Sequence, residues 1–185
     1  MDPVASVGRV ARPRLTLPGL GVRALSAQGL LLAAAGFLLP AAAHATGLPV
    51  RVLLPMHWPV ILVGLCYGWR SGALAGFAAP GLSFVLSGMP YPPMLPPMTL
   101  ELAAYGFLAG FFRERLRWSA AWATALALAG GRLLFLALVV VTGATGGALA
   151  PYLKAAMLPG LAAGLAQVLL LPSIARWWVA RESRE

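Results

Sequence analysis

Four ionisable side chains lie in or at the ends of the apolar segments of this chain: His57, Glu101, Arg132 and Lys154. Ionised groups are costly inside a membrane and usually line a cavity or pair with one another. Arg132 or Lys154 would neutralise a carboxylate or phosphate on a small ligand, and Glu101 and His57 would hydrogen-bond its polar face. The four side chains therefore predict a ligand site, which is selective because a ligand lacking one polar group leaves a buried partner unpaired.

The same residues also have structural interpretations, and the sequence leaves both open. Glu101 and Arg132 can form an ion pair that stabilises the fold, or at least one of them faces a ligand. His57 can cap the start of a helix through a ring nitrogen, or it contacts the ligand.

The connection Met89–Met98 is rich in proline and methionine and carries no charge. Prolines stiffen the chain, and methionines form an adaptable apolar cover. We expect this connection, with a neighbouring aromatic residue, to close over the apolar part of a ligand and to form the mouth of its site. The residues predicted for this role are Trp58, Met89, Tyr91, Met94 and Thr99.

Motifs for catalysis are absent from the sequence. There is no HExxH motif and no P-loop, and Asp2 is the only aspartate. His44 and His57 have no cysteine or aspartate close in the sequence, so they form a weak metal motif. The sequence predicts a binding protein that is not an enzyme, with no metal and no cofactor, and any ATP hydrolysis would belong to a partner.

The composition predicts an integral membrane protein. Of 185 residues, 60% are hydrophobic and 10% are charged, whereas a soluble domain has roughly 25% charged residues. The net charge of +9 is spread over chain ends and short connections, a pattern that favours membrane orientation over nucleic-acid binding. We expect an all-α protein with six transmembrane helices, at about Leu25–Ala43, His57–Gly68, Ala73–Ser87, Pro97–Phe112, Trp118–Val141 and Lys154–Val179.

The basic residues predict the orientation. With six spans and a cytoplasmic N-terminus, 11 of the 14 basic residues fall on the cytoplasmic side, as the positive-inside rule requires. Both termini are then cytoplasmic, and the four ionisable groups lie near the outer end. The predicted organisation is a flexible tail (1–22), a six-helix binding domain (23–180) and a short tail (181–185). We favour an uncleaved first span over a signal peptide, because the run from Leu25 is long for one.

Small residues recur on one face of the first span, at Gly29, Ala33 and Gly36. Such stripes let helices approach closely in lipid. The spacing fits packing within the chain and docking to another membrane subunit equally well.

Several motifs, in this order, resemble the substrate-binding (S) components of energy-coupling factor (ECF) transporters over about residues 25–180. They are PMHWPV at 55–60, GLCYGWRSGALAGFAAPGLSFVLSGMP at 64–90, TLELAAYG at 99–106, Gly131-Arg132, and Leu158-Pro159-Gly160 before Gln167.

The resemblance implies a six-helix bundle in a bacterial cytoplasmic membrane that captures a vitamin-like micronutrient on its outer face. It also implies two kinds of partner, a transmembrane coupling subunit and a pair of cytoplasmic ATPases. Gly29, Ala33 and Gly36 match the small residues that contact the coupling subunit in the family, which favours docking for this stripe. Two alternatives remain: a scaffold protein of the kind that organises cell-wall synthesis, and a stand-alone ion-coupled carrier with Glu101 as proton acceptor.

Overall fold

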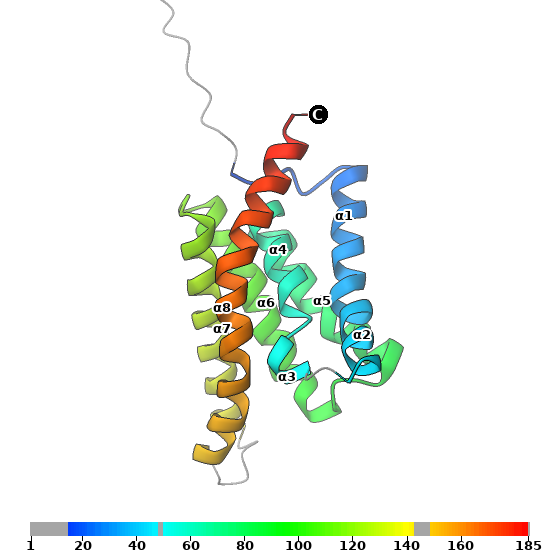
Figure 1. The fold of residues 1–185 in the computed structure, drawn as a ribbon, viewed down its shortest axis with the longest axis vertical. Coiled ribbons are helices and arrows are strands. Elements are labelled where there is room, and N and C mark those ends of the chain that lie inside the picture. The colour runs from blue at the N-terminus through cyan, green and yellow to red at the C-terminus, as the bar shows by residue number, and fades with distance from the viewer. Residues whose placement is uncertain (1–14, 48–49, 143–148, 185) are drawn as a thin grey trace, which may run out of the picture.

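The computed structural model describes residues 15–47, 50–142 and 149–184, and within them the regular structure is entirely helical (Figure 1). In chain order the elements are α1 (Val22–Ala33), η1 (Ala34–Leu38), α2 (Leu39–Ala45), α3 (Val50–Leu53), α4 (His57–Tyr67), α5 (Trp69–Ser87), η2 (Pro92–Met94), α6 (Leu95–Glu114), α7 (Ala120–Val141) and α8 (Leu149–Glu182).

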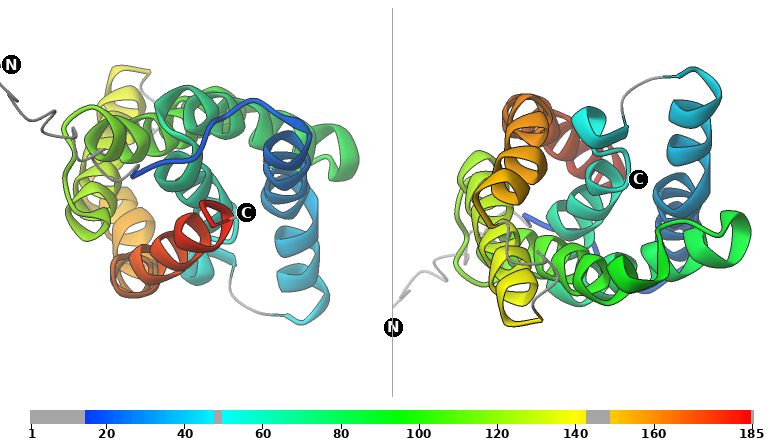
Figure 2. Two further views of the ribbon diagram at one scale, coloured as in Figure 1. Left: turned by 90° about the horizontal axis from the view of Figure 1, so that it is seen from above. Right: turned by 90° about the horizontal axis from the view of Figure 1, so that it is seen from below.

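The long helices run up and down along one direction (Figure 1). α1, η1 and α2 follow one another without a break, from Val22 to Ala45, and η1 is a π-helical turn. The start of α1 and the end of α8 lie at the same end of the bundle (Figure 1). Seen along its axis, the bundle has α5 to α8 grouped around α4, with α1 and α2 on one side (Figure 2).

α4 is the central helix of the bundle. Ten of its 11 residues are buried, with Trp58 half-buried. A helix that is apolar all round belongs inside a protein or a membrane. At 1.5 Å per residue, α4 is only about 16 Å long, so it does not span a bilayer by itself and is enclosed by its neighbours instead.

Glycines bring α4, α5 and α6 into backbone contact. A β-carbon added to Gly72 on α5 would overlap the carbonyl group of Gly106 on α6, and one added to Gly64 on α4 would overlap the same carbonyl. Because lipid gives helices no hydrophobic reason to associate, close packing of small residues is what holds such helices together. This contact fixes α6, and therefore Glu101, relative to α4.

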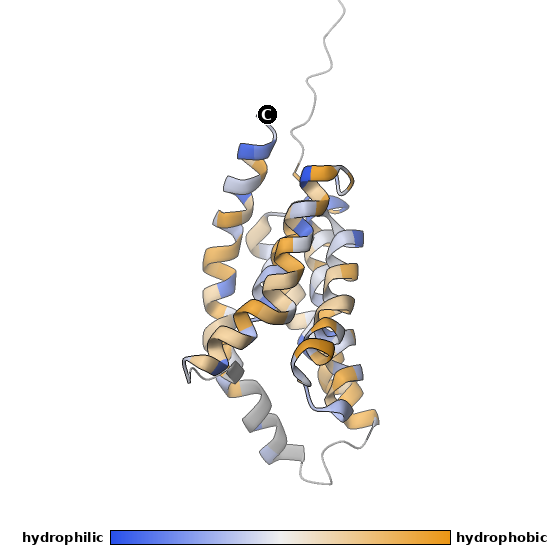
Figure 3. Ribbon diagram, turned by 90° about the vertical axis from the view of Figure 1, so that its right-hand side faces the viewer, coloured by the Kyte–Doolittle hydropathy of each residue, from blue (hydrophilic) through white to orange (hydrophobic). Residues whose placement is uncertain are grey.

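The outer surface is that of an all-α membrane protein. Among the described residues, three helical stretches are long and apolar enough to cross a membrane: Val22–Ala45, Ala120–Val141 and Leu158–Glu182. Large apolar side chains such as Leu74, Leu133 and Leu165 point outward and are at least 60% exposed. Figure 3 shows that hydrophobic residues recur along the helices of the bundle.

The chain before α1 lies against the bundle where it is described. The backbone N–H of Leu17 donates to the carbonyl of Cys66 at the end of α4 (2.7 Å), and the Leu17 side chain packs against the core. The Gln28 amide donates to the carbonyl of Gly19 (2.9 Å). Of the tail predicted for 1–22, residues 1–14 lie outside the described residues, and 15–21 form an ordered strap across this end of the bundle.

Candidate functional site

An ion pair joins α6 to α7 in the interior. Arg132 Nη1 on α7 lies 2.9 Å from Glu101 Oε1 on α6, and the Glu101 side chain is 4% exposed. The same carboxylate oxygen accepts a hydrogen bond of 2.6 Å from the Tyr105 hydroxyl, one helical turn along α6. Of the two interpretations open for Glu101 and Arg132, the structure therefore shows direct pairing.

The Gly131-Arg132 motif has a structural reason here. A β-carbon on Gly131 would overlap the Tyr105 ring, so glycine makes room for the aromatic side chain beside the ion pair. The next residue, Arg132, then reaches the carboxylate that Tyr105 also bonds. The Arg132 guanidinium also lies 5.7 Å from the centre of the Phe135 ring, within cation–π range.

His57 stands at the first turn of α4, next to this network. Its ring centre is 4.9 Å from that of Tyr105, the two planes are inclined by 48°, and the residue is 3% exposed. Both ring nitrogens are buried and have no hydrogen-bond partner among the described residues. The start of α4 has no side-chain capping bond, so the capping role considered for His57 is not present in the structure.

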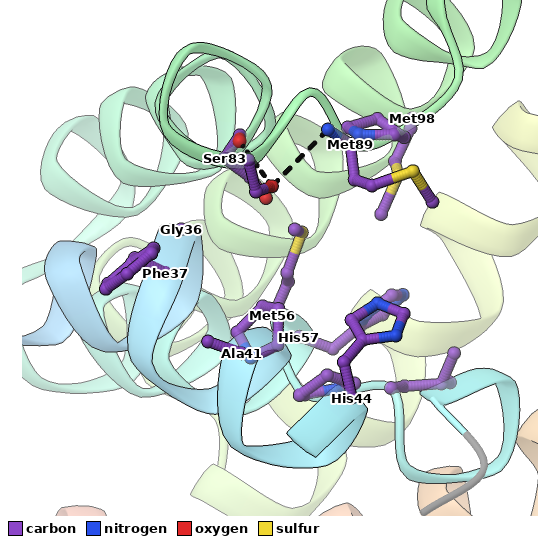
Figure 4. A pocket seen from close by; sticks show the side chains of 14 residues that line it. Gly36, Phe37, Ala41, His44, Met56, His57, Ser83, Met89 and Met98 are labelled. Carbon is purple, nitrogen blue, oxygen red and sulfur yellow. Dashed lines mark hydrogen bonds between the residues drawn. The ribbon is translucent and has the colours of Figure 1, made fainter. Parts of the chain in front are cut away.

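A cavity of about 520 Å³ opens beside His57. Its wall is formed by η1 and α2, the start of α4, the end of α5, the connection after α5 and the start of α6. Figure 4 shows the side chains of Met56, Met89 and Met98 reaching toward the same space. The lining also includes His44, Ser83 and Ser87. Cavities of a few hundred Å³ with apolar walls and few polar groups are the usual form of small-molecule sites.

Other residues predicted for the site lie outside this lining. Trp58 is half-buried, and its indole N–H donates to the carbonyl of Leu53 (2.9 Å). Tyr91 is 67% exposed. Met94 and Thr99 are half-buried. Lys154 is exposed on the first part of α8. The structure therefore brings together Glu101, Arg132 and His57, but leaves Lys154 apart from them.

The small-residue stripe is divided between two environments. Gly36 is buried, and a β-carbon there would lie about 3 Å from atoms of Ala79 and Leu82 on α5. Gly29 is exposed, with open space where its side chain would be, and Ala33 is half-buried. Gly36 therefore serves packing within the chain.

A second hollow, of about 390 Å³, lies on the α7–α8 side and is lined by Arg132, Tyr105 and Gly160. Its outer wall contains Leu161 and Leu165, both more than 60% exposed. Leu54, in the segment that leads into α4, lines both hollows.

Sequence reasoning missed Tyr105, which connects Glu101 to His57. The available signal was its spacing: residues four apart lie on the same face of a helix, so Tyr105 had to follow Glu101 into the interior. It also missed Met56, Met98 and Ser83. Ser83 and Met98 come from α5 and α6, and Met56 comes from the turn before α4. No pattern in the sequence shows that they surround one space.

The fold and the cavity define the class of protein: a helical membrane protein with a ligand-sized, apolar cavity at one end. The family model of the ECF transporter substrate-specific component matches residues 25–176, most of the chain. The chain belongs to this family. No curated protein and no solved structure matches the chain.

Proposed function

We propose that the protein is the substrate-binding subunit of an ECF-type importer in a bacterial cytoplasmic membrane. It captures a vitamin-like micronutrient at the outer face and delivers it with a coupling subunit and a pair of cytoplasmic ATPases. One observation carries the proposal: a family member has a cavity of about 520 Å³ at a single end of its bundle. That end is opposite the one where the described chain begins and finishes (Figure 1).

The charge distribution supports the orientation. In the proposed topology α1–α2, α4, α5, α6, α7 and α8 make six crossings. Arg70 at the start of α5, Arg113 at the end of α6 and Arg181 at the end of α8 lie at the end with the described termini. Basic residues are enriched on the cytoplasmic side of membrane proteins. The cavity then faces outward, where a nutrient arrives.

The predicted site residues take different roles in this proposal. His57 and Met89 line the cavity and contact the ligand. Tyr91 and Met94 belong to the connection that carries Met89, so we propose that they close the mouth. Trp58 and Thr99, half-buried near the ends of α4 and α6, hold this closure in place.

The remaining ionisable residues act less directly. Glu101 and Arg132 hold Tyr105, and through it the His57 ring, in position. Lys154 is exposed on α8 and is not among the residues that line the cavity, so we assign it no contact with the ligand.

Docking to the coupling subunit is assigned to the outer face of α1. Gly29 has open space around it, and Ala33 follows one turn later on the same face. A partner helix can approach closely at such residues. Gly36 packs against α5 and is not part of this docking face.

The test is reconstitution in proteoliposomes with the coupling subunit and the ATPases. Co-purification with these partners and uptake that requires ATP support the proposal. Uptake that follows an ion gradient without ATP points instead to a stand-alone carrier. Co-purification with wall-synthesis enzymes, without uptake, points to a scaffold.

A further inference from the structure

Among the described residues that line the cavity beside His57 there is no Asp, Glu, Lys or Arg. The wall consists of backbone, aliphatic, aromatic, thioether, hydroxyl and imidazole groups. Burying a charged group without a partner is costly, so a ligand with a net charge would find no counter-ion in this wall. The chemistry of the wall therefore restricts what the cavity can hold.

Glu101 and Arg132, the ion pair beside His57, already neutralise each other. Glu101 Oε1 receives both the Arg132 guanidinium (2.9 Å) and the Tyr105 hydroxyl (2.6 Å), and neither Glu101 nor Arg132 lines the cavity. A carboxylate or phosphate on a ligand would have to compete with Glu101 for Arg132 and would leave the Glu101 carboxylate buried without its partner. Such an exchange is unfavourable.

Among the described residues that line the cavity, His57 is the one whose buried side-chain polar atoms lack a hydrogen-bond partner; Gln167 on α8 is also buried without a partner but does not line the cavity. His57 is 97% buried, and both of its nitrogens lack a hydrogen-bond partner among the described residues. Leaving a buried polar group without a hydrogen bond is costly, so this imidazole is expected to have a function. A neutral imidazole has one donor and one acceptor, and the cavity is the space into which a partner can come.

Three thioethers shape the rest of the space. Met56, Met89 and Met98 come from the start of α4, the connection after α5, and α6. Methionine side chains adapt to irregular apolar surfaces and make favourable contacts with aromatic rings. Phe37 on η1 adds an aromatic wall opposite them (Figure 4).

From these observations we infer the substrate class: an uncharged, mainly apolar small molecule with one hydrogen-bonding group that meets His57. The inference rests on the proposed function and narrows its ligand. The bound molecule lies between the three methionines and η1, with its polar group directed at α4. The charged residues Glu101 and Arg132 support His57 through Tyr105 and do not touch the ligand.

Three probes of similar shape test this class on the purified full chain in detergent. They are 2-naphthol, which is neutral with a hydroxyl group, naphthalene, which has no polar group, and 2-naphthoate, which is an anion. Equilibrium dialysis should show that 2-naphthol binds on the order of tenfold more tightly than either of the other probes. This affinity ratio is the one expected from the free energy of one buried hydrogen bond. Preference for 2-naphthoate, or no binding of 2-naphthol, overturns the inference.

The His57→Phe variant should lose the preference for 2-naphthol over naphthalene, and His57→Gln should keep part of it. Leu133→Phe is the control, because Leu133 on α7 is exposed and does not line the cavity, and its affinities should equal those of the wild type. An unchanged preference in His57→Phe contradicts the assignment. If His57→Phe does not fold, as judged by gel filtration, His57→Gln and the wild-type probe series still decide.

A second measurement uses the natural ligand. Small molecules that co-purify with the wild-type chain are released and their charge at neutral pH is determined by ion-exchange retention and mass spectrometry. A neutral species supports the inference, and a charged one overturns it. ATP-dependent uptake by the reconstituted complex tests the proposed function separately, because it can succeed with a ligand of any charge.

Discussion

A double-mutant cycle on Glu101 and Arg132 tests whether these residues are partners or ligand contacts. The cycle compares Glu101→Gln, Arg132→Met and the double variant. Arg132→Met leaves the Glu101 carboxylate, 4% exposed, with the Tyr105 hydroxyl as its remaining donor. Breaking a buried ion pair on one side costs about 3–5 kcal/mol, and we expect about 3 kcal/mol because the tyrosine bond persists.

The other two variants of the cycle should lose less unfolding free energy. Glu101→Gln leaves Arg132 unpaired, but this side chain is 17% exposed and can turn toward water, so about 1–2 kcal/mol is expected. The double variant buries no charge at either position. Replacing a buried pair by neutral residues of similar size is often close to neutral, and we expect a loss below about 1 kcal/mol.

The coupling free energy between the two positions is therefore expected to be about 3–5 kcal/mol. It is measured from equilibrium unfolding in mixed detergent micelles, followed by circular dichroism, for all four proteins. Ordinary side-chain hydrogen bonds in membrane proteins couple by about 0.6 kcal/mol on average, so a value below about 1 kcal/mol refutes the buried pair. The double variant should also retain the co-purified ligand. Loss of the ligand in a stably folded double variant would show that Glu101 or Arg132 contacts it.

Three further predictions concern packing and docking. Gly72→Ala should lower the free energy of unfolding by about 2–3 kcal/mol, because the added carbon overlaps Gly106; the unfolding measurement is the one described above. Gly81→Ala is the control, because its added carbon meets open space. Equal losses in the two variants would contradict the close contact. Gly131→Ala should cost about 1–3 kcal/mol by displacing the Tyr105 ring; a wild-type unfolding curve would show that the ring does not need this space. Gly29→Leu should leave unfolding unchanged but reduce co-purification of the coupling subunit at least tenfold, whereas Gly81→Leu should reduce neither; undiminished co-purification with Gly29→Leu would remove α1 as the docking face.

The sequence was sufficient to predict the helical membrane fold and the family. Both can be predicted from properties that are read directly along the chain and do not depend on which segments meet in space. These are the low charge, the long apolar runs, and the order of short motifs such as Gly131-Arg132. The apolar helix His57–Tyr67 has 11 residues, too few to cross a membrane alone, and the structure shows that its neighbours enclose it.

The arrangement of the site was less accessible from sequence. Counting residues along a helix gives the depth of a side chain but not the direction in which it points. Lys154 was placed by depth beside Glu101 and Arg132, yet it is exposed on α8. Gly36 shares a stripe with Gly29, but η1 turns it toward α5.

The cavity itself depends on helices that are distant in the sequence. Met56, Ser83 and Met98 surround one space only because the glycine contacts set the positions of α4, α5 and α6. No local pattern encodes such a relation. The same is true of the link from Arg132 through Tyr105 to His57, which requires three helices to meet at one level.

The most direct test of the account is to fill the cavity and examine what the protein carries. Ser83 is 1% exposed and lines the cavity, so Ser83→Phe should occupy part of its volume. Small molecules released from equal amounts of purified wild-type protein and variant are compared by mass spectrometry, with gel filtration and thermal unfolding as checks on folding. We expect one species, near one molecule per chain in the wild type and absent from the folded variant. The same species at the same level in both proteins, or none in the wild type, would contradict a ligand site in this cavity.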